Sequence, residues 1–241
     1  MIIDVYTYVH NEEFMLPYFF RHYGPIARKI TVFDNESTDG TVDFCKKQGA
    51  EVIPVITGGK HRVDMLRMYM NEGYRVSRGE ADWVICAEGD EFFWHHNLLG
   101  LLELYKNEGV TLPKTQGYDM VSNVPPSGDG QIYDEIKEGF PNVMYSKRGI
   151  FNPFVDINFD YGGHKCAPQG PVVENETPEI FLLHYRFLGE RYFADRYEIR
   201  RQRMCDEDAS RGLGAGCLKD HMAQYRMHME RARGNIVRVL E

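Results

Sequence analysis

Three carboxylates follow directly after a short apolar run in the first half of the chain. The run spans residues 83–87, and Glu88, Asp90 and Glu91 come after it. A run of this kind is typical of a buried strand, and carboxylates at its end would lie at the sheet edge where open α/β folds bind ligands. Carboxylate oxygens suit Mg²⁺ or Mn²⁺, which in turn bind phosphates. A turn of solvated acids explains the same residues equally well when the segment is considered alone.

The spacing of these carboxylates suggests one ligand position. Glu88 and Asp90 flank Gly89, so in an extended segment both side chains would point the same way, toward a metal ion or a metal-bound pyrophosphate. Glu91 would point away, into a second shell around the metal or into a salt bridge. His184 also ends an apolar run, and its neutral imidazole could complete a Mn²⁺ site.

A second polar string covers residues 34–41, directly after another expected strand, and reads Asp-Asn-Glu-Ser-Thr-Asp-Gly-Thr. Asp34 could accept a hydrogen bond from the N–H of a uracil-type or thymine-type base. Ser37 and Asp39 could fix the turn. An Asx turn followed by a helix cap explains Asn35, Ser37 and Asp39, but not the whole string.

The end of the first expected strand offers backbone and side-chain groups to a nucleotide. These residues are Val9, His10, Asn11 and Glu12. The alternative is an ordinary helix start, with Asn11 as the N-cap and acids in the first turn.

Three further side chains could reach a phosphate: His61, Arg62 and Arg67. Arginines at helical spacing more often form a solvated face, so the alternative is a purely structural role.

The order of expected elements predicts an α/β fold. Strands are expected over 2–9, 29–33, 51–56 and 83–87, and helices over 14–23, 41–48 and 62–76. This alternation predicts a parallel sheet with right-handed crossovers. Further on, a helix is expected over 98–105, strands over 117–123, 143–151 and 180–184, and helices over 190–205 and 219–233, joined by a Gly-rich turn at 212–216. The first of these last two helices is expected to carry Arg196, Arg200 and Arg203 on an exposed basic side.

Composition limits the classes of partner. The chain has 241 residues, 43% of them hydrophobic, and a net charge of −8. Residues 190–241 hold 11 Lys or Arg and 9 Asp or Glu, and the remainder holds 17 and 27. An acidic body argues against a nucleic-acid partner. The absence of an 18-residue apolar run, of a signal peptide and of paired cysteines predicts a cytoplasmic protein, whose C-terminal helices could touch a membrane.

Together these motifs resemble the family-two glycosyltransferases with the GT-A fold. The likeness is greatest to a branch in which the first strand ends in Asn-Glu and the second in Asp-Asn-Xaa-Ser-Xaa-Asp-Gly-Thr. That branch carries Asp-Xaa-Asp-Glu-Phe where this chain has Glu88-Gly89-Asp90-Glu91-Phe92. The likeness is good over residues 1–110 and continues loosely to His164 and His184.

The resemblance implies a GT-A (Rossmann-like) fold with a mixed, mainly parallel sheet flanked by helices. A glycosyltransferase domain would cover residues 1–189, with a nucleotide-sugar half over 1–110 and an acceptor half over 111–189. Residues 190–241 would form a C-terminal amphipathic helical extension.

The resemblance also implies a nucleoside-diphosphate sugar donor, UDP- or TDP-linked, held with Mn²⁺ or Mg²⁺. Asp34 would meet the base, Asp90 the metal and the ribose–diphosphate region, and His184 the metal. Glu88 is longer than the Asp of the family at this position, so it would reach the metal differently.

Inverting transfer to an acceptor hydroxyl requires a general base on the acceptor side, while the metal offsets charge on the leaving diphosphate. Asp119 is the first candidate for this base. Asp156, Asp160 and His164 are the alternatives. The acceptor could be a glycan, a lipid-linked sugar, a protein or a small molecule.

Two other functions compete with this one. A non-catalytic scaffold or binding module would explain Glu88 and the lack of an evident base. A sugar-phosphate nucleotidylyltransferase would need a Gly-rich, cationic loop after the first strand, where this chain has His10-Asn11-Glu12-Glu13.

Overall fold

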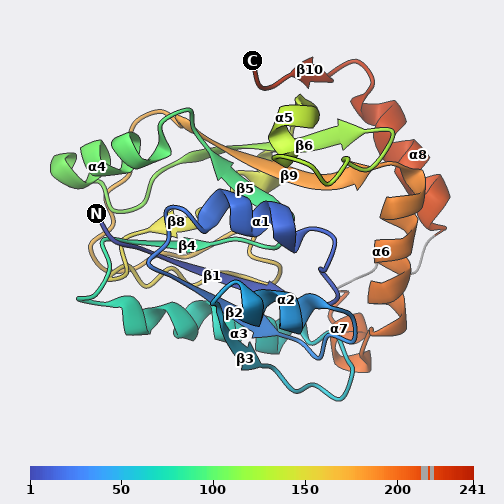
Figure 1. Ribbon diagram of the computed structural model, residues 1–241, viewed down its shortest axis with the longest axis horizontal. Coiled ribbons are helices and arrows are strands. Elements are labelled where there is room, and N and C mark those ends of the chain that lie inside the picture. The colour runs from blue at the N-terminus through green and yellow to red at the C-terminus, as the bar shows by residue number, and fades with distance from the viewer. Residues whose placement is uncertain (213–216, 218–219) are drawn as a thin grey trace.

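Two five-stranded sheets form the framework of the computed structural model, which describes residues 1–212, 217 and 220–241 (Figure 1). The strands are β1 (Ile3–Val9), β2 (Lys29–Asp34), β3 (Glu51–Pro54), β4 (Trp83–Cys86), β5 (Glu91–Trp94), β6 (Thr115–Ser122), β7 (Glu138–Pro141), β8 (Ile150–Phe151), β9 (Ile180–Leu188) and β10 (Val237–Arg238). The helices are α1 (Leu16–Tyr23), α2 (Thr41–Lys47), α3 (Val63–Glu72), α4 (Leu98–Glu108), α5 (Ile132–Glu135), α6 (Glu190–Gln202), α7 (Asp206–Ser210) and α8 (His221–Ala232), with 3₁₀ turns η1 (Gly73–Ser77) and η2 (Val143–Tyr145). The predicted turn at 212–216, apart from Gly212, and the predicted helix start at 219 lie outside the described residues.

The first sheet has the order β3-β2-β1-β4-β8, and its first four strands are parallel. Helices α1, α2 and α3 connect these four strands in turn. The predicted α/β architecture with a parallel sheet flanked by helices is therefore confirmed. The short β8 runs antiparallel to β4 and closes one edge.

The second sheet has the order β10-β7-β6-β9-β5 and is mainly antiparallel, with β6 and β9 as its one parallel pair in the described part of the chain. Three of its strands, β5, β7 and β10, have no counterpart among the predicted elements. They are only two to four residues long, too short for an alternating pattern to be recognised.

The strand predicted over residues 143–151 is wrong. The segment forms the 3₁₀ turn η2, a connection and the two-residue β8. Lys147 is 5% exposed and turns inward to buried carboxylates, and Gly149 packs so closely that an added Cβ would lie 2.4 Å from the Phe93 ring and 2.5 Å from the Cys86 oxygen. Tertiary contacts have therefore overridden the local strand propensity.

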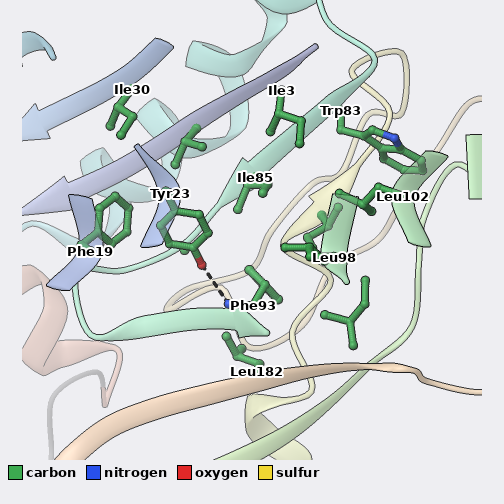
Figure 2. Close-up of a cluster of buried hydrophobic side chains, with 14 of the residues drawn as sticks. Ile3, Phe19, Tyr23, Ile30, Trp83, Ile85, Phe93, Leu98, Leu102 and Leu182 are labelled. Atoms are coloured by element: carbon green, nitrogen blue, oxygen red, sulfur yellow. Dashed lines mark hydrogen bonds between the residues drawn. The ribbon is translucent and has the colours of Figure 1, made fainter. Parts of the chain in front are cut away.

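A buried apolar cluster joins α1 and the first sheet to α4 and β5 (Figure 2). The Tyr23 hydroxyl lies at its centre, where it accepts a hydrogen bond from the Phe93 N–H at 2.9 Å and donates one to the Glu91 carbonyl at 3.1 Å. Burying a tyrosine hydroxyl is favourable only when it is hydrogen-bonded in this way. The contact fixes β5, which carries Glu91, relative to α1.

Residues 190–241 form a strand of the second sheet as well as helices. Helix α6 packs against α8 and β9, and β10 pairs with β7 of the second sheet. In Figure 1, α6 lies beside the end of β1, across both sheets. The domain division at residue 190 stays a prediction.

Within the described ranges, every helix is too short or too polar to cross a membrane.

His22 on α1 gives a prediction for the pH dependence of folding. Its Nε2 lies 3.0 Å from the Phe93 carbonyl, and burial lowers its pKa to about 4. The unfolded chain, with a pKa of about 6.5, takes up the proton first. Stability from His22 is therefore complete above about pH 6.5, falls as the pH falls, and is gone below about pH 4.

We expect the free energy of unfolding to fall by about 1.4 kcal/mol per pH unit more steeply in the wild type than in His22→Gln, between about pH 6 and 4.5. Urea titrations at several pH values measure this difference. Parallel pH profiles of the two proteins would contradict it.

Candidate active site

Asn11 connects the loops that follow β1 and β2. It has a left-handed φ of 52°. Its N–H donates to the Ser37 hydroxyl at 2.9 Å, and its side-chain oxygen accepts from the Thr38 N–H at 2.8 Å. The predicted helix cap is therefore wrong: α1 begins only at Leu16, after Met15 and without a side-chain cap. The two polar strings fold onto each other because each satisfies the other's backbone groups.

The strand end at Asp34 is covered by an arginine from the C-terminal part of the chain. Asp34 is 6% exposed; one of its oxygens accepts from the Ser37 N–H at 3.2 Å, and the other, Oδ1, is buried without a partner. Arg203 donates to the Asn35 carbonyl at 2.9 Å and to its side-chain oxygen at 2.8 Å. Asp39 turns away to cap Thr41.

The acidic segment is a tight turn and not an extended strand. The Glu91 N–H donates to the Glu88 carbonyl at 3.0 Å, and the Glu88 N–H donates to a Glu91 carboxylate oxygen at 3.1 Å. The prediction that Glu88 and Asp90 point the same way because the segment is extended is therefore wrong. Lys147 Nζ lies 2.8 Å from Glu88 Oε1 and 2.5 Å from Glu91 Oε1. Glu91 forms a salt bridge, one of the two roles predicted for it, but it does not point away from Glu88, because one lysine binds both carboxylates.

The balance between burial and neighbouring cations shifts the pKa values of Glu88 and Glu91 in opposite directions. Burial alone would raise the pKa of Glu88, but the Lys147 and Arg200 cations outweigh it and hold the pKa below its usual value. Burial raises the pKa of Glu91, and Lys147 only partly offsets this. One lysine thus serves two buried carboxylates.

Asp90 lies between a cation and an imidazole. Its Oδ2 is 3.2 Å from Arg196 Nη2 and 3.7 Å from His184 Nε2, while its Oδ1 is buried without a partner. Arg196 also donates to both oxygens of Glu12, at 2.6 and 2.7 Å. Burial alone would raise the pKa of Asp90, but the Arg196 charge outweighs it, so the pKa is lowered and the group is ionised near neutral pH.

The second sheet orients His184. In its register Glu91 and Asp119 lie opposite His184 on the two neighbouring strands. His184 Nδ1 donates to Asp119 Oδ1 at 2.8 Å, which directs Nε2 to the Asp90 side. The ring of Tyr145 stacks on His184 with centroids 3.9 Å apart. A carboxylate behind a histidine in this way is typical of metal-binding histidines.

Asp119 is fully buried, and both of its oxygens are in use. Its Oδ2 accepts from Asn142 at 2.7 Å and from Arg186 at 3.2 Å, in addition to the His184 bond on Oδ1. Burial alone would raise its pKa, but the His184 and Arg186 contacts lower it. This geometry favours a positioning role for Asp119 over the base role that the sequence suggested.

Three arginines at the C-terminal half of α6 and just after it face the protein interior. Arg196 reaches Glu12 and Asp90, Arg203 is buried against Asn35, and Arg200 lines the cavities described below. The prediction that these three form an exposed basic side is therefore wrong, although Arg191 and Arg201 on the same helix are exposed. The physical reason is that buried carboxylates and carbonyl oxygens opposite α6 need these donors as partners.

Two connected cavities lie under α6. The larger, of about 1100 Å³, and the smaller, of about 580 Å³, share Tyr8, Glu88 and Arg200 among their walls. Of the predicted site residues, the larger is lined by His61, Arg67, Glu88, Asp90, Asp160, His164 and His184. The smaller is lined by Val9, His10, Asn11, Glu12, Asn35, His61, Glu88, Gly89 and Asp90.

Several predicted site residues lie outside these cavities or are committed elsewhere. Arg62 pairs with Asp64 at 2.7 Å, in accord with the solvated-face alternative. Asp156 pairs with Arg78 at 2.7 Å and lines neither cavity. Burial lowers the pKa of His61 to about 3, so its imidazole is neutral.

Asp160 and His164 are the base candidates that line the larger cavity. Both belong to the loop containing Gly162 and Gly163, whose φ values of 81° and 65° favour glycine. His164 Nδ1 lies 3.2 Å from the Met144 carbonyl and can only donate to it, so the neutral ring has its lone pair on Nε2. Burial and the nearby Lys147 charge lower the pKa of His164.

The residues around Asp90 fit a divalent metal in part. Asp90 has an orphan buried oxygen, and His184 directs Nε2 to the Asp90 side, while Glu88 is held by Lys147. Within the described ranges, no three His, Cys, Asp or Glu side chains are grouped to hold a metal ion by themselves. A metal would therefore take Asp90 and His184 from the protein and its remaining ligands from water and substrate phosphate, as Mg²⁺ commonly does.

The structure adds residues that the sequence analysis missed as site groups. Tyr145 and Lys147 lay in a predicted strand, and Arg186 followed the predicted strand that leads to His184. The spacing of Arg196, Arg200 and Arg203 is evident in the sequence. The only sequence signal that these arginines face inward is the excess of acidic over basic residues in the rest of the chain.

Comparison with known proteins gives a limited likeness. No family model matches the chain, and no curated protein matches it. Glucosyl-3-phosphoglycerate synthase from Mycobacterium tuberculosis, in complex with Mn²⁺, UDP and phosphoglyceric acid, is 20% identical over 48% of this chain and 43% of its own, with a TM-score of 0.35. A crystal structure of a mycobacterial protein is 18% identical over 49% and 41%, also with a TM-score of 0.35. The chain thus covers less than half of the length of either neighbour.

Proposed function

We propose that this protein is a metal-dependent glycosyltransferase that moves a sugar from a nucleoside-diphosphate sugar to an acceptor hydroxyl. The observation that carries the proposal is the arrangement of Asp90 and His184, with Asp119 behind the imidazole, at cavities whose walls include the first strand end (residues 9–12) and Asn35 of the second. An ionised carboxylate and an oriented imidazole suit Mn²⁺, and Asp119 fixes the imidazole.

The bound metal would offset the negative charge that develops on the leaving diphosphate. Asp90 and His184 would hold it. Arg200 lines both cavities, and among the described residues its guanidinium forms no hydrogen bond or ion pair. The guanidinium lies over the Tyr197 ring, with Cζ 6.0 Å from the ring centroid, and its N–H groups could donate to a phosphate oxygen.

In the transfer step, the acceptor oxygen forms a bond to the anomeric carbon, the bond from that carbon to the diphosphate breaks, and the acceptor proton passes to a base. His164 Nε2 and the Asp160 carboxylate are the candidates for this base, because both line the cavity. Attack opposite the diphosphate inverts the anomeric centre.

Base recognition at Asp34 requires a rearrangement. The orphan Oδ1 of Asp34 suits the N–H of uracil or thymine, but the Arg203 side chain covers this strand end. A nucleotide that reaches Asp34 must displace Arg203 from Asn35.

A thermal-shift screen of UDP, TDP, GDP and CDP, each with and without Mn²⁺, tests the proposal. We expect one nucleotide to raise the melting temperature only with metal, since ligand at 100 times its dissociation constant stabilises the native state by about 2.7 kcal/mol. No shift with any nucleotide would contradict it.

One observation favours the second candidate, a non-catalytic nucleotide-binding module. Arg196 lies beside Glu12 and Asp90, and Lys147 lies beside Glu88, so each of these carboxylates already has a cation next to it without a metal. Metal-independent nucleotide binding, with no turnover of any UDP- or TDP-sugar, would support this candidate.

A further inference from the structure

A third cavity adjoins the proposed donor site on the side of α8. It is an open cleft of about 1640 Å³ between the second sheet, α6 and α8. Five of its lining residues also line the larger donor-side cavity: Tyr145, His164, Arg186, Tyr197 and Arg200. A molecule in the cleft therefore borders the same His164 and Arg200 that border the proposed donor site.

The cleft is cationic. Its charged lining consists of Arg186, Arg200 and Arg231 against the single carboxylate of Asp119. Asp119 is fully buried and already engaged by His184, Arg186 and Asn142, so it does not neutralise the other arginines. Neither Arg200 nor Arg231 forms an ion pair with any described residue. This concentration of positive charge is unusual on a chain with a net charge of −8.

Polar groups without partners also line the cleft. The Nε of Arg186 is buried with no hydrogen bond, although its Nη atoms bind Tyr145 and Asp119. The side-chain oxygen of Gln224 is likewise buried and has no partner among the described residues, and exchange of the amide oxygen and nitrogen would place an NH₂ donor there instead. Buried polar groups without partners are costly unless a ligand satisfies them.

We propose that this cleft binds an anionic group, a phosphate, on the acceptor, and so selects phosphorylated over neutral acceptors. The inference rests on the proposed transferase function and deepens it. Arg200 and Arg231 would supply the charge, and Arg186 and Gln224 would supply directed hydrogen bonds, which are strongest to ionised oxygens. With its anionic group held there, the acceptor would reach the proposed metal site past His164, a candidate base.

Sulfate, a dianion of the same shape that keeps Mn²⁺ in solution, is the probe for the cleft. Calorimetric titration at constant ionic strength, with and without saturating UDP and Mn²⁺, should show sulfate binding in both cases. We expect Arg231→Gln to weaken it about 10-fold. Arg233→Gln is the matched control, because Arg233 is exposed at the same helix end, pairs with Glu230 and lies outside the cleft lining.

The outcomes separate the two proposals. UDP binding without sulfate binding, or equal sulfate affinity in Arg231→Gln and the wild type, would overturn the anion site and leave the transferase proposal standing. Sulfate binding that depends on Arg231, in a protein that binds no nucleotide, would keep the anion site and contradict the donor site.

Acceptor assays then identify the source of the phosphate. Glucose 6-phosphate is compared with glucose and, in phosphatidylcholine vesicles, phosphatidylglycerol with diacylglycerol, using labelled UDP- and TDP-glucose. Because phosphatidylcholine has no acceptor hydroxyl, it serves only as the vesicle matrix, and diacylglycerol in the same vesicles is the unphosphorylated acceptor. Label in the sugar phosphate over glucose, or in phosphatidylglycerol over diacylglycerol, supports the proposal and names the source. We expect Arg231→Gln to raise KM about 10-fold for the phosphorylated acceptor alone. Preference for neutral glucose would overturn the proposal.

Discussion

Replacing Asp90 with asparagine should lower metal-dependent sugar transfer by about 10³-fold or more, because the carboxylate that would hold the metal beside His184 is lost. Asp90 Oδ1 has no partner within the described part of the chain, whereas Glu88 is held by Lys147. The same variant should abolish the part of the UDP-induced melting shift that depends on Mn²⁺. Initial rates and thermal shifts measure the two effects.

The fold should tolerate this change. Asparagine keeps the size of the side chain, and Arg196 keeps both hydrogen bonds to Glu12. Asp195→Asn is the matched control, because Asp195 is on α6 beside Arg196 but is exposed and pairs only with Arg191. Retained metal-dependent transfer in Asp90→Asn would exclude Asp90 as a metal ligand.

Replacing Lys147 with methionine should destabilise the folded protein by about 3–5 kcal/mol at pH 7, because it leaves two buried carboxylates without their cation. Lys147 is 5% exposed and Glu91 is 1% exposed. Without the lysine the pKa values of both glutamates rise, so protonation should shrink the loss as the pH falls toward about 5. Urea unfolding at the two pH values measures this change.

Two comparisons isolate the charge effect. Lys106→Met removes a surface pair with Asp82 and should cost less than about 1 kcal/mol. Adding Glu91→Gln to Lys147→Met removes one of the two carboxylates left without a cation and should recover part of the lost free energy of unfolding. A Lys147→Met protein as stable as the Lys106→Met protein would show that the acids are compensated in another way.

The first sheet could be predicted from sequence because each of its elements has a local signal. Runs such as 29–33 and 83–87 are apolar and bounded by polar strings, and Gly49 ends the helix between them with a left-handed φ of 80°. The second sheet could not, because its short strands are defined by their partners. β10, for example, is two exposed residues paired with β7.

The candidate site likewise contains some residues that the sequence could predict and others that it could not. Asp90 and His184 could be named because each follows an apolar run directly. The partners that decide their chemistry could not: no local pattern indicates that register places Asp119 behind His184, or that Lys147 turns inward to Glu88 and Glu91. Pairing between distant charges leaves no periodic pattern in a single sequence, so only the folded arrangement shows it.

Arg196 contacts Glu12, which lies 184 positions earlier in the chain. During synthesis Arg196 is therefore made well after Glu12. At about 5–20 residues per second, a ribosome takes roughly 10–40 s to travel from Glu12 to Arg196. By then all four parallel strands of the first sheet have been made. The first sheet can therefore form while water still solvates the Glu12 and Asp90 carboxylates. Arg196, which pairs with both, is synthesised after these strands.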